Sequence, residues 1–273
     1  MKTKLFPSIL MTRSRLITDL VAVLFIALSA TVATAQMAQM PLNTGFNYGG
    51  WGPYQTVITP VSATPDNYWI NIASYPPTIP SVKRTFVLQT PILSWQTSLP
   101  ASHWISARDK ADSDPGVTPV LPGYTIYRKC FCLQDFSAPL ISFTLRADDT
   151  VQVWFNSQVN VMLPPQTGNW NTTAITSLPS KSSWFRTGTN CLYALVEDFL
   201  GLTGFDLSGT VTVTGPAPIP AFGTTPTYPC GCTTNPNPNG VEASASEDDS
   251  EVVAALIEIA EERRHARSAF PRR

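Results

Sequence analysis

The chain has 273 residues, of which only 14% are charged and 43% are hydrophobic, and its formal net charge is −1. Ordinary soluble domains carry roughly 25% charged residues. The neutral composition lacks the basic excess of a nucleic-acid-binding protein, and the apolar content excludes disorder driven by charge.

The first 35 residues have the pattern of a secretory signal peptide. A basic region is followed by an apolar core without charge and then by a small-x-small cleavage site: Lys2 to Arg15, Leu20–Ala30 and Ala33–Ala35. The apolar core is shorter than the roughly 20 residues that span a membrane, so membrane contact is expected only through an uncleaved signal. We therefore expect cleavage before Gln36 and a secreted or cell-envelope protein.

Residues 36–214 form the main domain, and their composition is that of a β-sheet protein. They are rich in Thr, Ser, Val, Asn and Pro and contain a single Glu, which favours strands over helices. The clearest extended runs are Ser81–Leu88, Tyr124–Leu133, Leu140–Leu145, Val151–Phe155, Cys191–Glu197 and Leu207–Val213. Short strands with no helical stretch between them predict an all-β, antiparallel sandwich.

Several of these runs alternate apolar and polar residues. Tyr127, Phe131 and Leu133 fall on one face of their run, and Val151–Phe155 and Leu207–Val213 alternate in the same way. This period of two is typical of strands that bury one face.

The C-terminal fifth of the chain changes character twice. Residues 215–241 form a Pro- and Cys-rich linker, with seven Pro before Gly240, which cannot form a central strand. Residues 242–273 are a charged tail, in which apolar residues at helical spacing predict an amphipathic helix over about 248–267. The helix is either a loosely docked tail or the docking element for a protein partner.

A series of short motifs recurs along the main domain in a recognisable order. Arg146–Ser157 contains an acidic turn followed by V-x-V-W-F-N-S, and the others are S-H-W-I-S at Ser102–Ser106, Y-R-K-C-F-C-L at Tyr127–Leu133, G-T-N-C-L at Gly188–Leu192 and L-T-G-F-D-L-S-G at Leu202–Gly209. Together they resemble the galactose-binding-like jelly-roll modules of secreted bacterial proteins, although Ser157 stands where those modules usually have Gly. The resemblance covers about 43–214. It implies an antiparallel jelly roll of eight or nine strands, and binding or adhesion rather than catalysis.

Five cysteines are expected to form disulfides, because the chain is expected to be exported. They are Cys130, Cys132, Cys191, Cys230 and Cys232. Residues i and i+2 of a strand project to the same side, so Cys130 and Cys132 should take different partners. We expect Cys191 to pair with one of them and the linker pair to supply the remainder, with one thiol left over. A zinc site is disfavoured, because its cysteines are usually spaced C-x₂₋₄-C.

The candidate ligand-binding residues are aromatic and amide side chains. Asn169, Trp170 and Asn171 lie in a polar loop, and Trp51 lies between two glycines. Flat aromatic rings beside amide groups suit the apolar face of a sugar. Other tryptophans, such as Trp69 and Trp104 beside Ile, are expected in the core.

Two adjacent pairs of acids, Asp148-Asp149 and Glu197-Asp198, are the candidates for carboxylate chemistry. Glycoside hydrolysis needs two carboxylates that face each other. Adjacent strand residues point to opposite faces, so we expect no catalytic residues. Asp148 and Asp149 are weak candidates for a structural Ca²⁺ with loop carbonyls, and no other cofactor is expected.

These features predict an extracellular, non-catalytic binding or adhesion module, with carbohydrate as the favoured ligand class. The expected partners are a neutral glycan or another extracellular surface, and not nucleic acid. One alternative is a structural envelope or matrix protein that self-associates through sheet edges, the odd cysteine or the tail helix. A second alternative is a secreted glycoside hydrolase.

Overall fold

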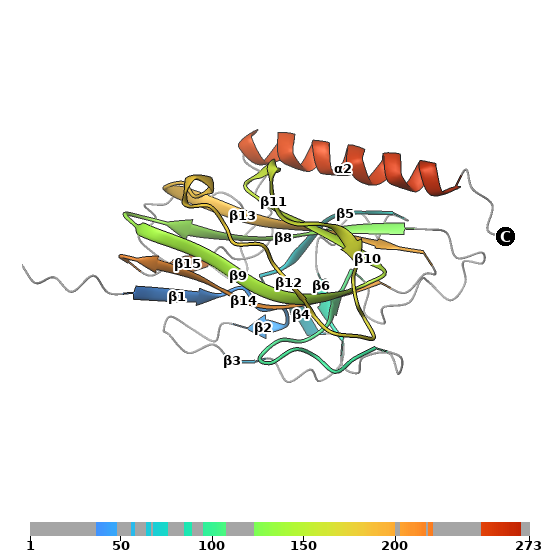
Figure 1. Ribbon diagram of the computed structural model, residues 1–273, viewed down its shortest axis with the longest axis horizontal. Helices are drawn as coiled ribbons and strands as arrows, with labels where there is room; N and C mark the ends of the chain where they lie inside the picture. Colours follow the sequence, from blue (N-terminus) through green and yellow to red (C-terminus); the bar gives the residue numbers. More distant parts are fainter. Residues whose placement is uncertain are drawn as a thin grey trace, which may run out of the picture. The chain divides into compact units, whose positions relative to one another are not determined.

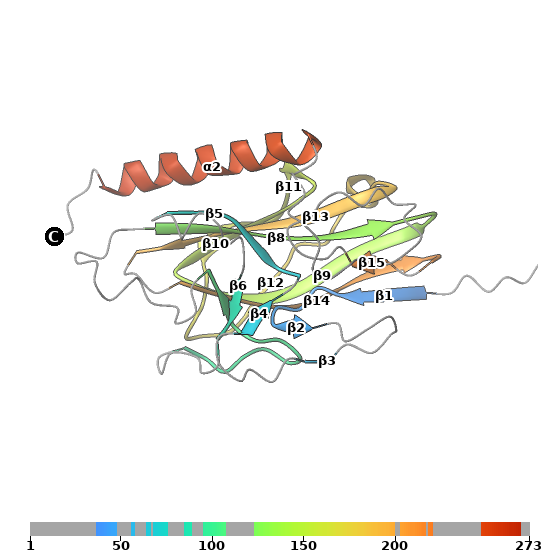
Figure 2. The ribbon, with the colours of Figure 1, turned by 180° about the vertical axis from the view of Figure 1, so that it is seen from behind.

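A computed structural model describes residues 37–47, 56–57, 64–66, 68–75, 85–88, 95–107, 123–199, 203–216, 218–220 and 247–268. Two antiparallel sheets pack against each other, and one helix lies on the outer side of one of them (Figures 1 and 2). In the described part of the chain, one sheet has seven strands and the other has six. The expected all-β sandwich with a C-terminal helix is confirmed.

The strands and helices are given next in their order along the chain. They are β1 (Met37–Pro41), β2 (Phe46–Asn47), β3 (Thr56–Val57), β4 (Thr64–Asp66), β5 (Ile70–Tyr75), β6 (Thr85–Val87), β7 (Ile105–Ser106), β8 (Gly123–Leu133), β9 (Ser137–Asp148), β10 (Thr150–Phe155), β11 (Ser157–Thr167), β12 (Ile175–Thr176), the 3₁₀ turn η1 (Ser182–Trp184), β13 (Gly188–Asp198), β14 (Gly204–Thr214), β15 (Ile219–Pro220) and α2 (Glu247–Ser268).

The strand order is that of a jelly roll. The seven-stranded sheet runs β12-β9-β14-β7-β6-β4, with β1 also paired to β14, and the six-stranded sheet runs β11-β10-β13-β8-β15, with β5 also paired to β8. From β7 to β14 the chain crosses between the sheets at every connection except the β10–β11 hairpin. This closed pattern of crossings is the double Greek key of a jelly roll.

The main hydrophobic core lies between the two sheets and follows the predicted alternation. Tyr127, Phe131 and Leu133 of β8 point into it together with Val151, Val153 and Phe155 of β10. Val211 and Val213 of β14 meet them from the other sheet. Trp69 and Trp104 are fully buried, as expected, and Trp69 also packs edge-on against Phe205.

One charged residue of β8 is enclosed in the same interior. Lys129 is 1% exposed, and its Nζ lies 5.5 Å from the ring centre of Tyr68 and 3.4 Å from the backbone oxygen of Asn43. Burial lowers the pKa of Lys129 to about 8, although the charge of Asp66 opposes this shift. Asp66 is itself buried and accepts hydrogen bonds from three backbone N–H groups, so the lysine lies close to a fixed negative group.

The helix α2 covers the outer face of the six-stranded sheet, as both ribbon views show (Figures 1 and 2). Leu256 and Ala260 of the helix are buried against Trp154, Tyr193 and Leu195 of the sheet. The predicted helix over about 248–267 is therefore confirmed, and its apolar side is occupied by the sandwich of its own chain.

The outer face of the seven-stranded sheet has the opposite chemistry. Along β9 and β14 it presents hydroxyl-bearing side chains that are exposed or half-buried: Ser142, Thr144, Ser208, Thr210, Thr212 and Thr214. Strand β1 continues this face with the exposed Gln39, which lies opposite Thr212. The helix α2 packs on the other sheet, and the segment 99–102 contacts Asp206 and Ser208 at one part of this face.

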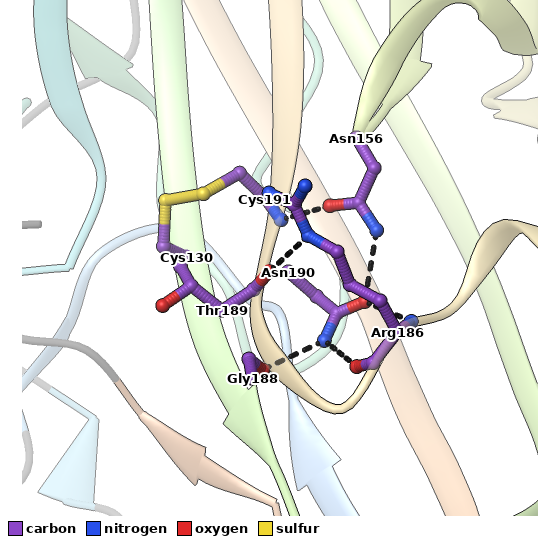
Figure 3. The surroundings of a disulfide bond; sticks show 7 residues. All are labelled: Cys130, Asn156, Arg186, Gly188, Thr189, Asn190 and Cys191. Atoms are coloured by element: carbon purple, nitrogen blue, oxygen red, sulfur yellow. Dashed lines mark hydrogen bonds between the residues drawn. A yellow bond between two sulfur atoms is a disulfide. The ribbon is translucent and has the colours of Figure 1, made fainter. Parts of the chain in front are cut away.

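A disulfide joins the two central strands of the six-stranded sheet. Cys130 of β8 and Cys191 of β13 are direct register partners and are covalently bonded (Figure 3). Cys132 is also disulfide-bonded, to a partner outside the described residues. The expectation that Cys130 and Cys132 take different partners is confirmed, whereas Cys230 and Cys232 lie outside the described part of the chain.

Two asparagines beside this disulfide, Asn156 and Asn190, are hydrogen-bonded to each other (Figure 3). Asn156 forms the β10–β11 turn with φ +59°, a conformation that asparagine tolerates better than most residues. Its side chain donates to Asn190 Oδ1 and accepts from the Cys191 backbone. Both residues belong to the motifs that resemble galactose-binding-like modules, and here each has a structural role.

The N-terminal signal, Trp51 and most of the linker lie outside the described residues. Among the residues that are described, α2 is the one α-helix, and it is not apolar enough to cross a bilayer.

Candidate functional site

The Asn169–Asn171 loop follows β11 and is held against the end of β9. Gly168 donates to the Asp149 backbone oxygen over 2.7 Å and accepts from the Ala147 N–H over 2.7 Å. A Cβ at position 168 would lie 2.0 Å from the Ala147 oxygen, so only glycine permits this approach. Asn169 then turns the chain with φ +56°, and the next residue, Trp170, leaves the sheet.

Trp170 is half-buried and lies on a support of other aromatic rings. It packs against a small cluster formed by Leu88, Trp95 and Trp104. The rings of Trp95 and Trp104 are 4.4 Å apart, and their packing requires glycine at position 204, where a Cβ would lie 2.2 Å from Trp95. The indole of Trp170 is therefore backed by a rigid, buried pair of rings.

Gln96 joins the loop of Trp170 to the aromatic support. Gln96 donates through its backbone N–H to the Trp170 oxygen over 2.8 Å, and through Nε2 to the Asn171 oxygen over 3.2 Å. Asn171 is exposed and enters this contact through its backbone oxygen, which leaves its side-chain amide facing solvent. A half-buried aromatic ring and two residues with amide side chains, Gln96 and Asn171, thus belong to one hydrogen-bonded segment.

The Asp148-Asp149 pair lies beside the same aromatic support. Trp95 Nε1 donates to Asp148 Oδ2 over 2.8 Å, and the Phe199 N–H donates to Asp149 Oδ2 over 2.7 Å. Burial raises the pKa of Asp148 well above its ordinary range, and the neighbouring Asp149 and Asp198 carboxyl groups raise it further. The Asp149 carboxyl group is thus close enough to Asp148 to favour the protonated form of Asp148.

Strand alternation does not decide how the Asp148 and Asp149 side chains are directed. Strand β9 ends at Asp148 and β10 begins at Thr150, so Asp149 lies between strands and the alternation does not extend to it. The peptide bond between the two residues is cis.

The second acidic pair separates into two environments. Glu197 points to the outer side of the six-stranded sheet, where its Oε1 lies 3.1 Å from Arg267 of α2 and its Oε2 lies 3.4 Å from Arg263. The charge of Asp198 instead raises the pKa of Asp148. This pair follows the strand alternation, as expected.

No group of three or more His, Cys, Asp or Glu side chains in the described part of the chain is arranged to hold a metal ion. A Ca²⁺ at Asp148 and Asp149 stays a prediction. It would have to compete with the Trp95 N–H for Asp148 Oδ2 and with the Phe199 N–H for Asp149 Oδ2.

The loop predicted as ligand-binding, the aromatic support and the predicted Ca²⁺ candidates thus meet at one end of the sandwich. Trp51 lies outside the described residues and cannot be placed there. Sequence reasoning missed Trp95 and Gln96, because they lie in an irregular segment with no periodicity. No protein family, curated protein or solved structure matches this chain.

Proposed function

We propose that this protein is an extracellular, non-catalytic binding module of the galactose-binding-like type, and that its ligand is a neutral glycan seated on Trp170. The N-terminal signal would direct export and would be cleaved before Gln36. The module would attach the protein to a glycan-bearing surface, which is the adhesion role implied by the sequence resemblance.

The observation that carries this proposal is the partial exposure of Trp170 on a rigid support. Of the described tryptophans, Trp69, Trp95, Trp104 and Trp154 are buried, and only Trp170 and Trp184 are half-buried. Trp184 has Lys181 over its ring, with Nζ 5.7 Å from the ring centre, whereas the backbone oxygen of Trp170 is hydrogen-bonded to Gln96 and Asn171 follows it in the chain. A pre-positioned ring loses little conformational freedom on binding, which favours affinity.

The electrostatics of the site favour a neutral ligand. Because the pKa of Asp148 is raised, the Asp148–Asp149 pair is less negative near neutral pH than two ordinary carboxylates. An anionic ligand would still meet the remaining charge, and a cationic ligand would find a carboxyl group already engaged with Trp95. Sugar hydroxyl groups, which donate and accept, fit amide and carboxyl partners better than either kind of ion.

The test is a screen against neutral oligosaccharides on a glycan array, followed by calorimetry with the best ligand. We expect Trp170→Ala to weaken binding by about tenfold or more, which corresponds to about 1.4 kcal/mol. Asn171→Ala should weaken binding less, because it removes one amide and leaves the ring.

Trp184→Ala is the matched control, because it removes the other half-buried indole and should leave glycan affinity unchanged. Near-UV circular dichroism of each variant checks that the aromatic support remains packed. Binding that survives Trp170→Ala, or a wild-type protein that binds no neutral glycan, would contradict the proposal.

A further inference from the structure

The sandwich and its helix have separate hydrophobic cores. The core between the sheets is built entirely from β-sheet and loop residues and includes no residue of α2. The core beneath α2 is formed by Leu256 and Ala260 with Tyr124, Ile126 and Trp154, among others. The sandwich therefore keeps its main core intact when α2 leaves, and only the second core is opened.

The helix is held to the sheet by side chains alone. Tyr124 donates to Glu261 Oε1 over 2.9 Å, and Arg263 donates to Gln152 Oε1 over 2.5 Å. Arg263 and Arg267 both pair with Glu197. In the described part of the chain, no backbone hydrogen bond joins α2 to a strand, so separating α2 from the sheet would break side-chain contacts only.

Without α2, the outer face of the six-stranded sheet would be exposed to water and would need another cover. It would present two large aromatic residues, Trp154 and Tyr193, beside Ile126 and Leu195, and contiguous apolar patches of this kind are rarely left exposed on monomers. The charges around it, with Glu197 at one end, match the Arg263 and Arg267 positions of α2. The segment complementary to this face in both shape and charge is another copy of α2.

The connection between sandwich and helix is long enough to reach a neighbouring molecule. Residues 221–246 lie between β15 and α2, and a segment of that length spans at most about 90 Å. If a linker cysteine were bonded to the sandwich, residues 233–246 alone would still span at most about 45 Å. Either length exceeds the roughly 33 Å length of α2 itself.

We propose that α2 is exchanged between two copies of this chain, each helix covering the six-stranded sheet of the other molecule in a twofold dimer. The contacts in the exchanged form are the same as those within one chain, so exchange loses none of them. Linkage within one chain gives the helix a high effective concentration, about millimolar. The monomer therefore prevails in dilute solution, and the dimer forms where molecules are crowded.

A complementary pair of charge-reversal variants tests this directly. One variant is Glu197→Lys and the other is Arg263→Glu with Arg267→Glu, both in the full chain. Each variant alone sets like charges against each other within the monomer, whereas in the mixture each helix finds opposite charges on the other molecule. Size-exclusion chromatography with light scattering should show monomers separately and a 1:1 dimer on mixing. Two folded variants that remain monomers when mixed would overturn the proposal.

Because Glu197 is nearly buried, Glu197→Lys could fail to fold, and a second measurement uses the unaltered chain. Nitrogen-15-labelled and unlabelled wild-type protein are incubated together at about millimolar concentration, and native mass spectrometry counts mixed dimers. We expect mixed dimers for the wild type and none for Leu256→Asp. Absence of mixed dimers in the wild type, or dimers that persist in denaturing gels until a reductant is added, would overturn helix exchange.

Discussion

The two outer faces of the sandwich differ in what they expose and in what covers them. The six-stranded sheet is apolar and aromatic on its outer side and is covered by α2, whereas the seven-stranded sheet carries serine and threonine on its outer side and has no described helix on it. Strands buried on both faces lack polar alternation, and strands buried on one face show it. The strands that α2 covers therefore indicate, by their lack of polar alternation, that their outer face is buried, although α2 lies about 50 residues or more away in sequence.

Strands β13 and β8 of the six-stranded sheet and β14 of the seven-stranded sheet illustrate this rule. In β13 the residues Cys191–Val196 are all buried and nearly all apolar, and β8 is buried almost throughout. In β14 the inward Val211 and Val213 are separated by half-buried threonines. A continuous apolar run in one sheet and an alternating run in the other thus indicate where a cover lies.

The largest effect is expected from placing a charge under the helix. Leu256→Asp introduces a carboxylate at a position that is 0% exposed, and we expect it to weaken α2 docking by about 4 kcal/mol. Hydrogen exchange of the α2 amides should accelerate, while the strands of the main core keep their protection. Thr212→Asp is the matched control on the uncovered face and should change stability by about 0.5 kcal/mol or less.

The pH dependence of stability tests whether every part of the outer side of the seven-stranded sheet contributes little to the free energy of unfolding. Asp206 of β14 is buried there under the segment that contains Leu99 and Ser102, which both donate to it. Burial raises the pKa of Asp206 to about 6, so the folded state binds this proton more tightly than the unfolded chain does. The resulting stability is complete below about pH 4 and is lost as the pH rises through about 6.

We expect the free energy of unfolding to be about 2 kcal/mol greater at pH 4 than at pH 7 from Asp206 alone. Urea unfolding of the wild type and of Asp206→Asn, across this pH range, measures the difference. Asp66 and Asp148 shift in the same direction, so the variant should lose part of the pH dependence. A variant with the full wild-type dependence would show that Asp206 does not titrate as described.

The ion pairs at the end of α2 should contribute less than its apolar contacts. Arg263→Ala with Arg267→Ala removes both cations from Glu197, whose side chain is only 4% exposed. We expect a loss of about 1–2 kcal/mol, because the arginines are partly solvated and their pairing is weaker than that of fully buried charges. Lys181→Ala, outside the helix contact, is the control, and thermal unfolding at low and high salt is the measurement.

The smallest effect is expected on the hydroxyl-bearing face. Thr210→Ala and Thr212→Ala remove half-buried hydroxyl groups that no described hydrogen bond uses, and each should change stability by no more than about 0.5 kcal/mol. A loss above 1 kcal/mol in dilute solution would show that this face is engaged after all. The contrast between the covered and uncovered faces would then fail.

Much of the fold could be predicted from local patterns, and the relation between distant segments could not. Alternation in Tyr127–Leu133 and Val151–Phe155 identified the strands and their inward faces correctly, because one buried face imposes a period of two. The helix was also predicted within one residue at each end. Its docking site was missed, because periodicity reveals that a helix has an apolar side but not which surface receives it.

The candidate site was predicted only in part. The Asn169–Asn171 loop was identified from its composition, but its support by Trp95 and Gln96 depends on a contact between residues more than 70 positions apart. The directions of the Asp148 and Asp149 side chains could not be predicted from strand alternation, because β9 ends at Asp148. Loops between strands follow no period, so their side-chain directions require the folded structure.

Lys129 has a consequence for how this protein responds to chemical reagents. Its amine lies among Tyr68, Trp69 and the Asn43 carbonyl inside the sandwich, whereas Lys181 lies exposed on the surface. An acylating reagent should therefore label Lys181 at once and reach Lys129 only in molecules whose sheets have separated. Mass spectrometry of the two lysines would report the rate at which the whole sandwich opens, from a single native residue and without any added probe.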